Sequence, residues 1–315
     1  MQFSELDDDL LRRIVAVTLP ADAARIMRCG DGRICNLARE NVNARLAIHH
    51  AKLQALVEKL PPRAREAAET SLKPCKKALV SLNLVATQLC GKDGFNRGVF
   101  TLTGLTALTE YLKVDEFLTT IHLGGNSIGD DGAVLLSSAI KENRALTHLS
   151  VAGSRINYVG ATALSQALNV NTGLRTFSLL NNNIGIEGTR AFSRLLVGNR
   201  TLTDLDLSDA KLHGIAPLAR VLAATALSTF SIALNDIGDG GALLIAETLK
   251  DNTVLKHIDL EANHIGPEGG VAIAEALRGN AVLKSINLEY NGLGDEGKGA
   301  IRDAVSGRVG FELKM

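Results

Sequence analysis

The chain has 315 residues, of which 46% are hydrophobic and 22% are charged, and its 34 basic residues balance its 34 acidic ones. This composition is typical of a globular protein with a large core, and it excludes a disordered or collagen-like chain. The zero net charge gives no general attraction to nucleic acid or to a membrane surface, so we expect neither as a partner.

The first residues carry no pattern for secretion. Residues 1–13, MQFSELDDDLLRR, are acidic where a signal peptide is basic and then apolar. The chain contains no run of about 18 apolar residues, so we expect no transmembrane segment. These observations predict an intracellular protein, and the cytoplasm is the location that we expect.

Helical patterns fill residues 1–78. Apolar residues recur at helical spacing after Ser4, and a second helix can begin after Pro20. Residues 39–60 predict a longer helix that ends before two prolines, and residues 63–72 predict one more. We expect this region to be either a small helical domain or a cap on the region that follows.

Residues 6–29, LDDDLLRRIVAVTLPADAARIMRC, resemble the F-box motif in the order of their apolar and turn residues. F-box proteins bind the Skp1 adaptor of cullin ubiquitin ligases, and in some of them a repeat domain behind the motif chooses the substrate. The resemblance implies that a Skp1-like adaptor would contact Leu6, Leu10, Leu11 and Ile14. The alternative is an amphipathic helix that only caps the next region.

From residue 79 onward one sequence pattern recurs. Residues 255–280 read L-x-x-I-x-L-x-x-N-x-I-G-x-x-G, followed by an apolar helical pattern and a final Asn. Copies are 28 residues apart at every step but one, and they begin at Leu118, Leu146, Leu174, Leu202, Leu227, Leu255 and Leu283. The copy at Leu202 is three residues shorter, a diverged first copy begins at Leu79, and a partial copy begins at Phe311. A fixed period over so many copies indicates a solenoid.

Each position of the copy has a physical role. Ile258 and Leu260 alternate with polar residues, so we expect a short strand with these two side chains in the core. Asn263, at position nine, can donate to and accept from backbone groups of the turn, so stacked copies predict an asparagine ladder. Ser154 and Ala210 replace this Asn, which predicts interruptions in the third and fifth copies.

This pattern resembles leucine-rich repeats, specifically the 28-residue class of ribonuclease inhibitor, the NOD-like receptors and Ran GTPase-activating protein. The resemblance covers residues 79–315. It implies an α/β fold, a right-handed solenoid of about eight repeats in the shape of a horseshoe, with parallel strands inside and helices outside. We expect this repeat domain to follow the helical segment 1–78. Proteins of this class usually bind other proteins on the inner face.

On that inner face, the residues at positions three, five and seven of each copy point away from the core. They are small and polar in the early copies and acidic in the later ones, which predicts a protein partner with a basic surface over the later copies. The candidate binding residues are His122, His148, Asp204, Asp206, Asp209, His257, Asp259, Glu261, Asn287, Glu289 and Tyr290.

An insertion between Cys90 and Thr103 sets the first copy apart. It contains Phe95 and Phe100 in a chain that has no Trp and only 3% aromatic residues. Aromatic anchors contribute much of the binding energy at protein interfaces, so both are candidate exposed anchors. The alternative is that they fold back and cap the first repeat.

We expect no catalytic site, no metal site and no cofactor. Asp204 and Asp206 share a face about 7 Å apart, but no His, Cys or nucleophile converges on them. His122 and His148 lie on neighbouring strands without a third ligand. The four cysteines lack the close pairs of zinc sites, which favours idle thiols in a reducing compartment.

These patterns predict a non-enzymatic protein that holds a partner. The leading hypothesis is a protein-interaction scaffold, either free or as a structural subunit of a larger assembly. One alternative is an F-box-type substrate receptor of a cullin ubiquitin ligase. The other is a regulator of a small GTPase, which the resemblance to Ran GTPase-activating protein implies.

Overall fold

The computed structural model describes residues 47–48, 51–72, 81–90 and 101–315. Within them, a parallel sheet of nine strands runs in sequence order from β1 to β9. Each strand has three residues, and the strands are Ser81–Asn83 (β1), Thr120–His122 (β2), His148–Ser150 (β3), Thr176–Ser178 (β4), Asp204–Asp206 (β5), Thr229–Ser231 (β6), His257–Asp259 (β7), Ser285–Asn287 (β8) and Glu312–Lys314 (β9).

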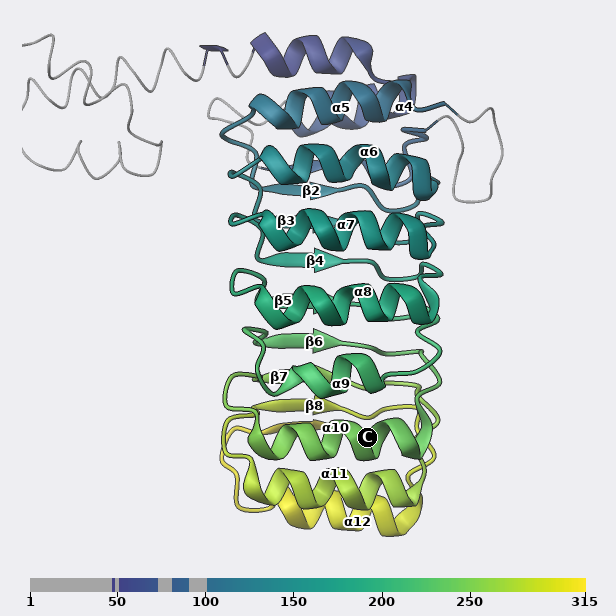
Figure 1. Cartoon of the computed structure of the whole chain (residues 1–315), viewed down its shortest axis with the longest axis vertical. Coiled ribbons are helices and arrows are strands. Elements are labelled where there is room, and N and C mark those ends of the chain that lie inside the picture. Colours follow the sequence, from purple (N-terminus) through teal and green to yellow (C-terminus); the bar gives the residue numbers. More distant parts are fainter. Residues whose placement is uncertain (1–46, 49–50, 73–80, 91–100) are drawn as a thin grey trace, which may run out of the picture.

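A helix follows each strand from β1 to β8 and returns the chain to the start of the next strand (Figure 1). These helices are Thr103–Val114 (α5), Gly129–Glu142 (α6), Tyr158–Val170 (α7), Gly185–Gly198 (α8), Ala216–Leu222 (α9), Gly238–Asp251 (α10), Pro267–Gly279 (α11) and Gly294–Val305 (α12). The row of helices is longer than the row of strands in Figure 1, so the array curves with the sheet on its inner side. This confirms the predicted α/β solenoid.

The strands stack in register, so residues at the same position of each copy lie side by side. The middle residue of each strand points into the core and pairs with its counterpart on the next strand. These residues are Leu82, Ile121, Leu149, Phe177, Leu205, Phe230, Ile258, Ile286 and Leu313. All except Leu313 are buried. The flanking residues at positions three and five therefore form the inner surface.

The glycine pair of the repeat has the predicted conformational role. In the sixth repeat, Gly238 has φ +59° at the entry to α10. A Cβ on Gly241 would lie 2.6 Å from the Cβ of Ile237, so only glycine fits there without a shift. The turn before this pair also has positive φ at two non-glycine residues, Leu234 at +60° and Asp236 at +53°.

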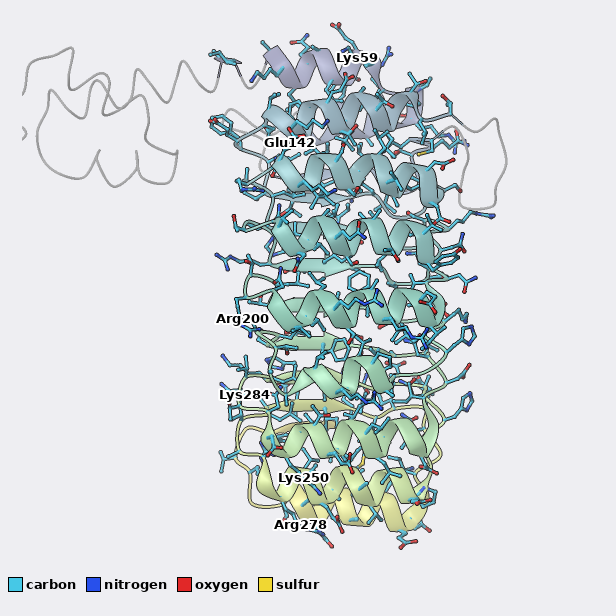
Figure 2. All side chains as sticks on the ribbon, in the orientation of Figure 1. Lys59, Glu142, Arg200, Lys250, Arg278 and Lys284 are labelled. Atoms are coloured by element: carbon cyan, nitrogen blue, oxygen red, sulfur yellow. The ribbon has the colours of Figure 1, made fainter. Side chains whose placement is uncertain are left out.

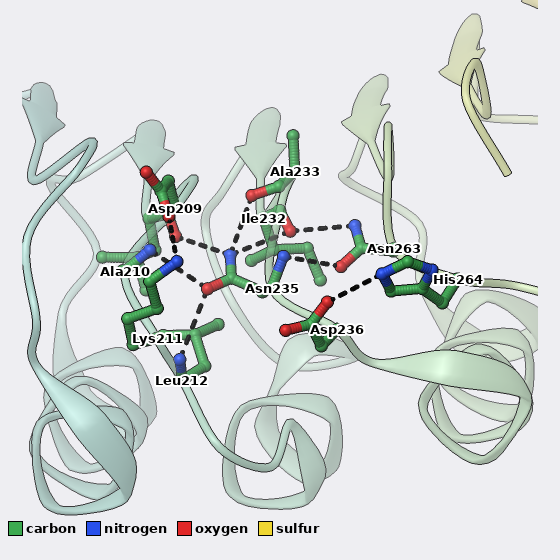
Figure 3. A network of polar contacts seen from close by, with 11 residues as sticks. Asp209, Ala210, Lys211, Leu212, Ile232, Ala233, Asn235, Asp236, Asn263 and His264 are labelled. Atoms are coloured by element: carbon green, nitrogen blue, oxygen red, sulfur yellow. Dashed lines mark hydrogen bonds and ion pairs between the residues drawn. The ribbon is translucent and has the colours of Figure 1, made fainter.

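The predicted asparagine ladder is present (Figure 3). In the sixth repeat, Asn235 Oδ1 accepts from the N–H groups of Ala210 at 3.1 Å and Leu212 at 3.3 Å. Its Nδ2 donates to the carbonyls of Leu207 and Ile232, each at 2.9 Å. The same arrangement recurs at Asn126, Asn182, Asn263 and Asn291. Each amide thus satisfies buried backbone groups of two neighbouring repeats.

The two predicted interruptions of the ladder differ. Ser154 is buried, and its hydroxyl donates to the carbonyls of Ala152 at 3.2 Å and Leu123 at 3.5 Å. The interruption in the third repeat is therefore only partial, because a serine takes over part of the role of the amide. Ala210 has no polar side chain, so the interruption in the fifth repeat is confirmed.

A second row of asparagines closes the helices on the opposite edge of the array. Asn252 donates its N–H to the Thr248 carbonyl at 3.1 Å and its Nδ2 to the Leu222 carbonyl of the previous repeat at 2.7 Å. Its Oδ1 accepts from the Leu255 N–H at 2.7 Å. Equivalent residues are Asn143, Asn171, Asn199 and Asn280. The final Asn of the sequence pattern is thus a helix cap that also ties neighbouring helices together.

All eight helices run in the same direction, so their C-termini share one edge of the array. Several of them carry a basic residue in the last turn, which interacts favourably with the negative end of the helix dipole. Arg200 and Lys284 extend along the same edge (Figure 2). We call this the basic edge, and its cations include Lys113, Lys141, Arg200, Lys250, Arg278 and Lys284.

The described part of the N-terminal region matches its helical prediction. Residues 51–59 are helical, the chain turns at Pro61, and α4 spans Pro62–Leu72. The buried side chains of Leu53 and Leu56 belong to the same core cluster as Leu82 of β1. This part of the chain therefore packs on the first repeat. The predicted domain boundary at residue 78 lies outside the described residues and stays a prediction.

Candidate protein-interaction surface

The inner face of the later strands brings the predicted acidic residues together. Strand register places Asp206, Ser231, Asp259 and Asn287 side by side on β5 to β8. With strands about 4.8 Å apart, the backbones of Asp206 and Asp259 lie about 10 Å from each other. Both carboxylates are partly exposed.

Hydrogen bonds hold these carboxylates in place. Asp206 accepts from the Ser178 hydroxyl at 2.8 Å and from the Ser208 N–H at 3.0 Å. Asp259 Oδ1 accepts from the Glu261 N–H at 3.0 Å, and Glu261 Oε2 accepts from Asn287 Nδ2 at 2.9 Å. The side chains are thus oriented by neighbouring repeats instead of moving freely in solvent.

Burial of the Asp259 carboxyl raises its pKa above the ordinary value for aspartate. The N–H of Glu261 opposes this shift, whereas the negative charges of Glu261 and Asp206 add to it. Lys314 lowers the pKa and is the smallest of these influences. We call Asp206, Asp259 and Glu261 the inner acidic cluster. Its charges repel one another, and the positive charge nearby offsets this repulsion only in part.

Other predicted residues surround this cluster. Asp204 accepts from the Thr203 hydroxyl at 2.6 Å, and Asp209 pairs with Lys211 Nζ at 2.6 Å (Figure 3). His257 Nδ1 lies 2.7 Å from the Ser285 hydroxyl. Glu289 and Tyr290 follow β8, and Tyr290 is 80% exposed. The structure therefore gathers the predicted later residues on one surface, whose role in binding stays a prediction.

The two predicted histidines of the early repeats lie apart from that surface. His122 is on β2 and His148 is on β3, and strand register pairs each with a different residue, Ser150 and Thr120. His148 Nδ1 lies 2.7 Å from the Thr147 hydroxyl. The early and late halves of the inner face thus differ in chemistry, because the carboxylates of strands β5 and β7 lie in the later half.

The predicted binding residues do not include two exposed apolar side chains at the turn edge of the inner face. Leu180 is 37% exposed, and Leu234 is 49% exposed. Leu234 occupies position eight of its repeat, the same position as Tyr290 two repeats later. Comparison of position eight across the copies could have found it. These residues place apolar surface beside the acidic side chains.

Chemical sites are not evident in the described part of the chain. Among its residues, no group of three His, Cys, Asp or Glu side chains is arranged to hold a metal ion. Burial raises the pKa of the Cys90 thiol to about 12, which disfavours the reactive thiolate. No helix in the described ranges is both long and apolar enough to cross a membrane.

Some predicted site residues lie outside the described residues. They are the predicted adaptor-binding residues Leu6, Leu10, Leu11 and Ile14 and the predicted loop anchors Phe95 and Phe100.

Comparison with known proteins identifies the repeats. The family described as Leucine Rich repeat matches residues 114–137, 142–165, 198–214, 225–246, 251–274 and 279–301. No curated protein sequence matches the chain.

Solved structures resemble the chain at low sequence identity. The leucine-rich repeat-containing protein LegL7 from Legionella pneumophila is 17% identical, with a TM-score of 0.48 over 78% of this chain and 77% of LegL7. The tropomodulin C-terminal domain from Caenorhabditis elegans is 13% identical, with a TM-score of 0.37 over 56% of this chain and 92% of that domain. The leiomodin-1 actin-binding site 2 is 21% identical, with a TM-score of 0.35 over 54% of this chain and 85% of that structure. From the family matches and the stacked strands and helices, we conclude that the repeats of this chain are leucine-rich repeats.

Proposed function

We propose that this chain is a non-enzymatic scaffold whose later repeats bind a basic surface of a protein partner. Leucine-rich repeat domains generally mediate protein–protein interaction. The observation that carries the proposal is the inner acidic cluster, whose carboxylates are fixed by hydrogen bonds and, among the described residues, are offset only in part by Lys314. Basic groups of a partner would relieve the repulsion within this cluster.

The apolar residues beside the cluster support the same proposal. Tyr290 and Leu234 are exposed at the rim of the acidic surface. Interfaces combine a few large side chains that bury apolar area with charges that set orientation and partner choice. A basic partner with an apolar contact residue would therefore match this surface better than a purely basic one.

The proposal is tested by capture of the tagged full chain from its native cells, followed by identification of bound proteins by mass spectrometry. A variant with Asp206→Asn, Asp259→Asn and Glu261→Gln removes the cluster. A control with Glu247→Gln, Glu275→Gln and Glu296→Gln removes as much charge from exposed positions on α10, α11 and α12. We expect the control to retain a salt-sensitive partner that the cluster variant loses. Equal capture by both variants would overturn the proposal.

The narrower predictions from the sequence belong to the same experiment. An F-box role predicts that a Skp1-like adaptor and a cullin are captured, and that Leu10→Asp with Ile14→Asp removes them. A GTPase-regulator role predicts that a small GTPase is captured. An intracellular, cytoplasmic location and the ribonuclease-inhibitor-like class, which rests on the 28-residue period, remain part of the proposal.

A further inference from the structure

A cavity of about 550 Å³ opens at the basic edge beside the last complete repeat. It lies between the end of α11, the start of β8 and the turn after α12. The lining side chains that matter here are Arg278, Lys284, Arg308, Leu277, Val309 and Phe311. The cavity is therefore separate from the inner acidic cluster, which lies on the inner face of the sheet.

The cavity occurs where the second row of asparagines ends. Arg308 stands 28 residues after Asn280, in the place of the next asparagine of that row. Its Nη1 donates to the Leu277 carbonyl at 3.5 Å, just as Asn280 Nδ2 donates to the Leu249 carbonyl at 2.7 Å. A second guanidinium nitrogen donates to the Leu283 carbonyl. Arg308 therefore replaces a compact cap with a long cationic one.

Every charged side chain that lines the cavity is cationic. Arg278, Lys284 and Arg308 line it, and no carboxylate does. Arg278 and Lys284 are exposed, and no carboxylate in the described part of the chain forms an ion pair with either. Burial lowers the pKa of the Arg308 guanidinium. A bound anion would stabilise all three cations.

The cavity also has apolar walls. Leu277 is buried at its base, Phe311 is partly exposed, and Val309 is fully exposed. The guanidinium of Arg308 lies 4.3 Å from the centre of the Phe311 ring, which keeps the cation and the aromatic side chain together. A ligand that fits this wall needs an apolar group next to its negative charge.

Further cations lie beyond the cavity along the basic edge, among acidic residues such as Asp251 at the end of α10 and Glu142, which pairs with Lys113. Lys256 precedes β7 as Lys284 precedes β8, so these two lysines lie on neighbouring strands about 5 Å apart at the backbone. Lys250 and Arg278 end the neighbouring helices α10 and α11 (Figure 2). Helix-dipole effects account for the two helical cations, but not for the two lysines before the strands.

We propose that this cavity and the adjoining basic edge bind an acidic peptide segment of a partner protein, with an apolar side chain in the cavity. An extended chain can follow the row of cations, because the strands are about 4.8 Å apart and the side chains on one face of an extended peptide are about 6.6 Å apart, so acidic side chains can reach cations of successive repeats. A phosphate group fits less well. Helix C-termini converge on this edge, so the described helices do not offer there the N-terminal N–H groups that commonly bind phosphate. The negative ends of the helix dipoles disfavour any anion, and the cations of the edge must outweigh them. This surface is distinct from the acidic inner face, so one chain could hold two partners of opposite charge.

Selection from a random heptapeptide phage library on the immobilised full chain tests this inference. The expected result is enrichment of peptides that combine several Asp or Glu residues with a large apolar one. Arg278→Glu with Lys284→Glu should weaken their binding by about tenfold or more. A control with Arg190→Glu and Lys298→Glu, which changes the net charge equally in the first halves of α8 and α12 and away from the basic edge, should leave binding within about twofold.

Four readouts keep the outcomes separate. Removal of the inner acidic cluster should not weaken the selected peptides, so failure of this inference and failure of the proposed scaffold function are distinguishable. Enrichment of peptides without acidic residues, or equal binding by both charge-reversal variants, would overturn the inference. Binding of inorganic phosphate or phosphatidylserine vesicles that depends on Arg278 and Lys284, without peptide enrichment, would also overturn it. Thermal unfolding followed by circular dichroism establishes that each variant is folded.

Discussion

The fifth repeat and the sixth repeat meet the same packing requirement with different residues. The sixth repeat has Asn235 in its turn and a 14-residue helix, α10, which Asn252 caps. The fifth has Ala210 in its turn and a helix, α9, of only seven residues. Nevertheless β5 stays in register with both of its neighbours. The final asparagine position of the fifth repeat is also an alanine, Ala224. The strand stack therefore tolerates the loss of three residues and of two asparagines.

Neighbouring repeats supply the hydrogen-bond donors that the short repeat lacks. From α8, the hydroxyl of Thr189 donates to the Leu212 carbonyl at 3.0 Å, and that of Ser193 donates to the Pro217 carbonyl at 2.6 Å. From α10, the hydroxyl of Thr248 donates to the Ala219 carbonyl at 2.9 Å. In both repeats buried backbone carbonyls accept a hydrogen bond, and in the fifth repeat the donor belongs to a neighbouring repeat.

The largest expected effect comes from removal of a ladder amide in the regular repeat. Asn235→Ala leaves the Ala210 and Leu212 N–H groups and the Leu207 carbonyl without this partner. Each unsatisfied buried group is destabilising, so we expect the free energy of unfolding to fall by about 3 kcal/mol. Urea unfolding followed by circular dichroism measures it.

An exposed asparagine provides the control for that measurement. Asn183 lies near the ladder but is exposed, so Asn183→Ala should change the free energy of unfolding by less than about 0.5 kcal/mol. If the two variants unfold at the same urea concentration, the ladder is not the main source of stability between these repeats. The contrast between the fifth and sixth repeats would then need another explanation.

Removal of a substitute donor should have a smaller effect. Thr189→Val keeps the shape of a fully buried side chain but removes the hydroxyl that reaches the Leu212 carbonyl of the short repeat. We expect a loss of about 1.5 kcal/mol. In Thr162→Val, the lost hydroxyl contacts only the Tyr158 carbonyl of its own helix, so the loss should be under about 0.5 kcal/mol. Equal losses in urea unfolding would show that the short repeat does not depend on its neighbours.

Most of the fold could be predicted because every copy repeats the same physical requirements. The alternation around Ile258 and Leu260 fixes a strand, the glycine pair fixes a turn, and the period fixes the stacking. The second row of asparagines escaped prediction, although Asn280 ends the sequence pattern, because its partner is a carbonyl of the preceding repeat. Such contacts depend on the distance between neighbouring helices, and the length of the repeat alone does not predict this distance.

The candidate surface could be predicted by side-chain direction but not by environment. Alternation placed Asp206 and Asp259 on the inner face, and the structure confirms that placement. The degree of burial that raises the Asp259 pKa depends on packing from neighbouring strands. The cavity beside Arg308 could not be predicted, because it arises where the array departs from its own pattern.

Replacement of Leu234 tests whether the backbone of the candidate surface is strained. Leu234 has φ +60°, which is unfavourable for leucine, and Leu234→Gly should raise the free energy of unfolding by about 0.5 kcal/mol. Leu180→Gly is the matched control, since Leu180 is similarly exposed without positive φ, and it should lower stability by about 0.5–1 kcal/mol. If Leu234 contacts the partner, Leu234→Gly should weaken capture while it stabilises the fold. A loss of stability would show that the apolar contacts of Leu234 outweigh its backbone strain.

The smallest expected effect concerns the charge of Asp259. Because its pKa is raised in the folded state, the folded protein binds a proton more readily than the unfolded chain, so this group makes stability rise as pH falls from neutral. Asp259→Asn removes the charge and keeps an oxygen that can accept from the Glu261 N–H. At pH 7 the variant should be more stable than the parent by about 0.5 kcal/mol, and the difference should vanish as pH falls below the ordinary aspartate pKa of about 3.9. Glu275→Gln, on the exposed side of α11, should show neither effect. If Asp259→Asn also weakens capture of a basic partner, the same carboxylate opposes folding and favours binding, which is the behaviour expected of a functional charge and not of a structural one.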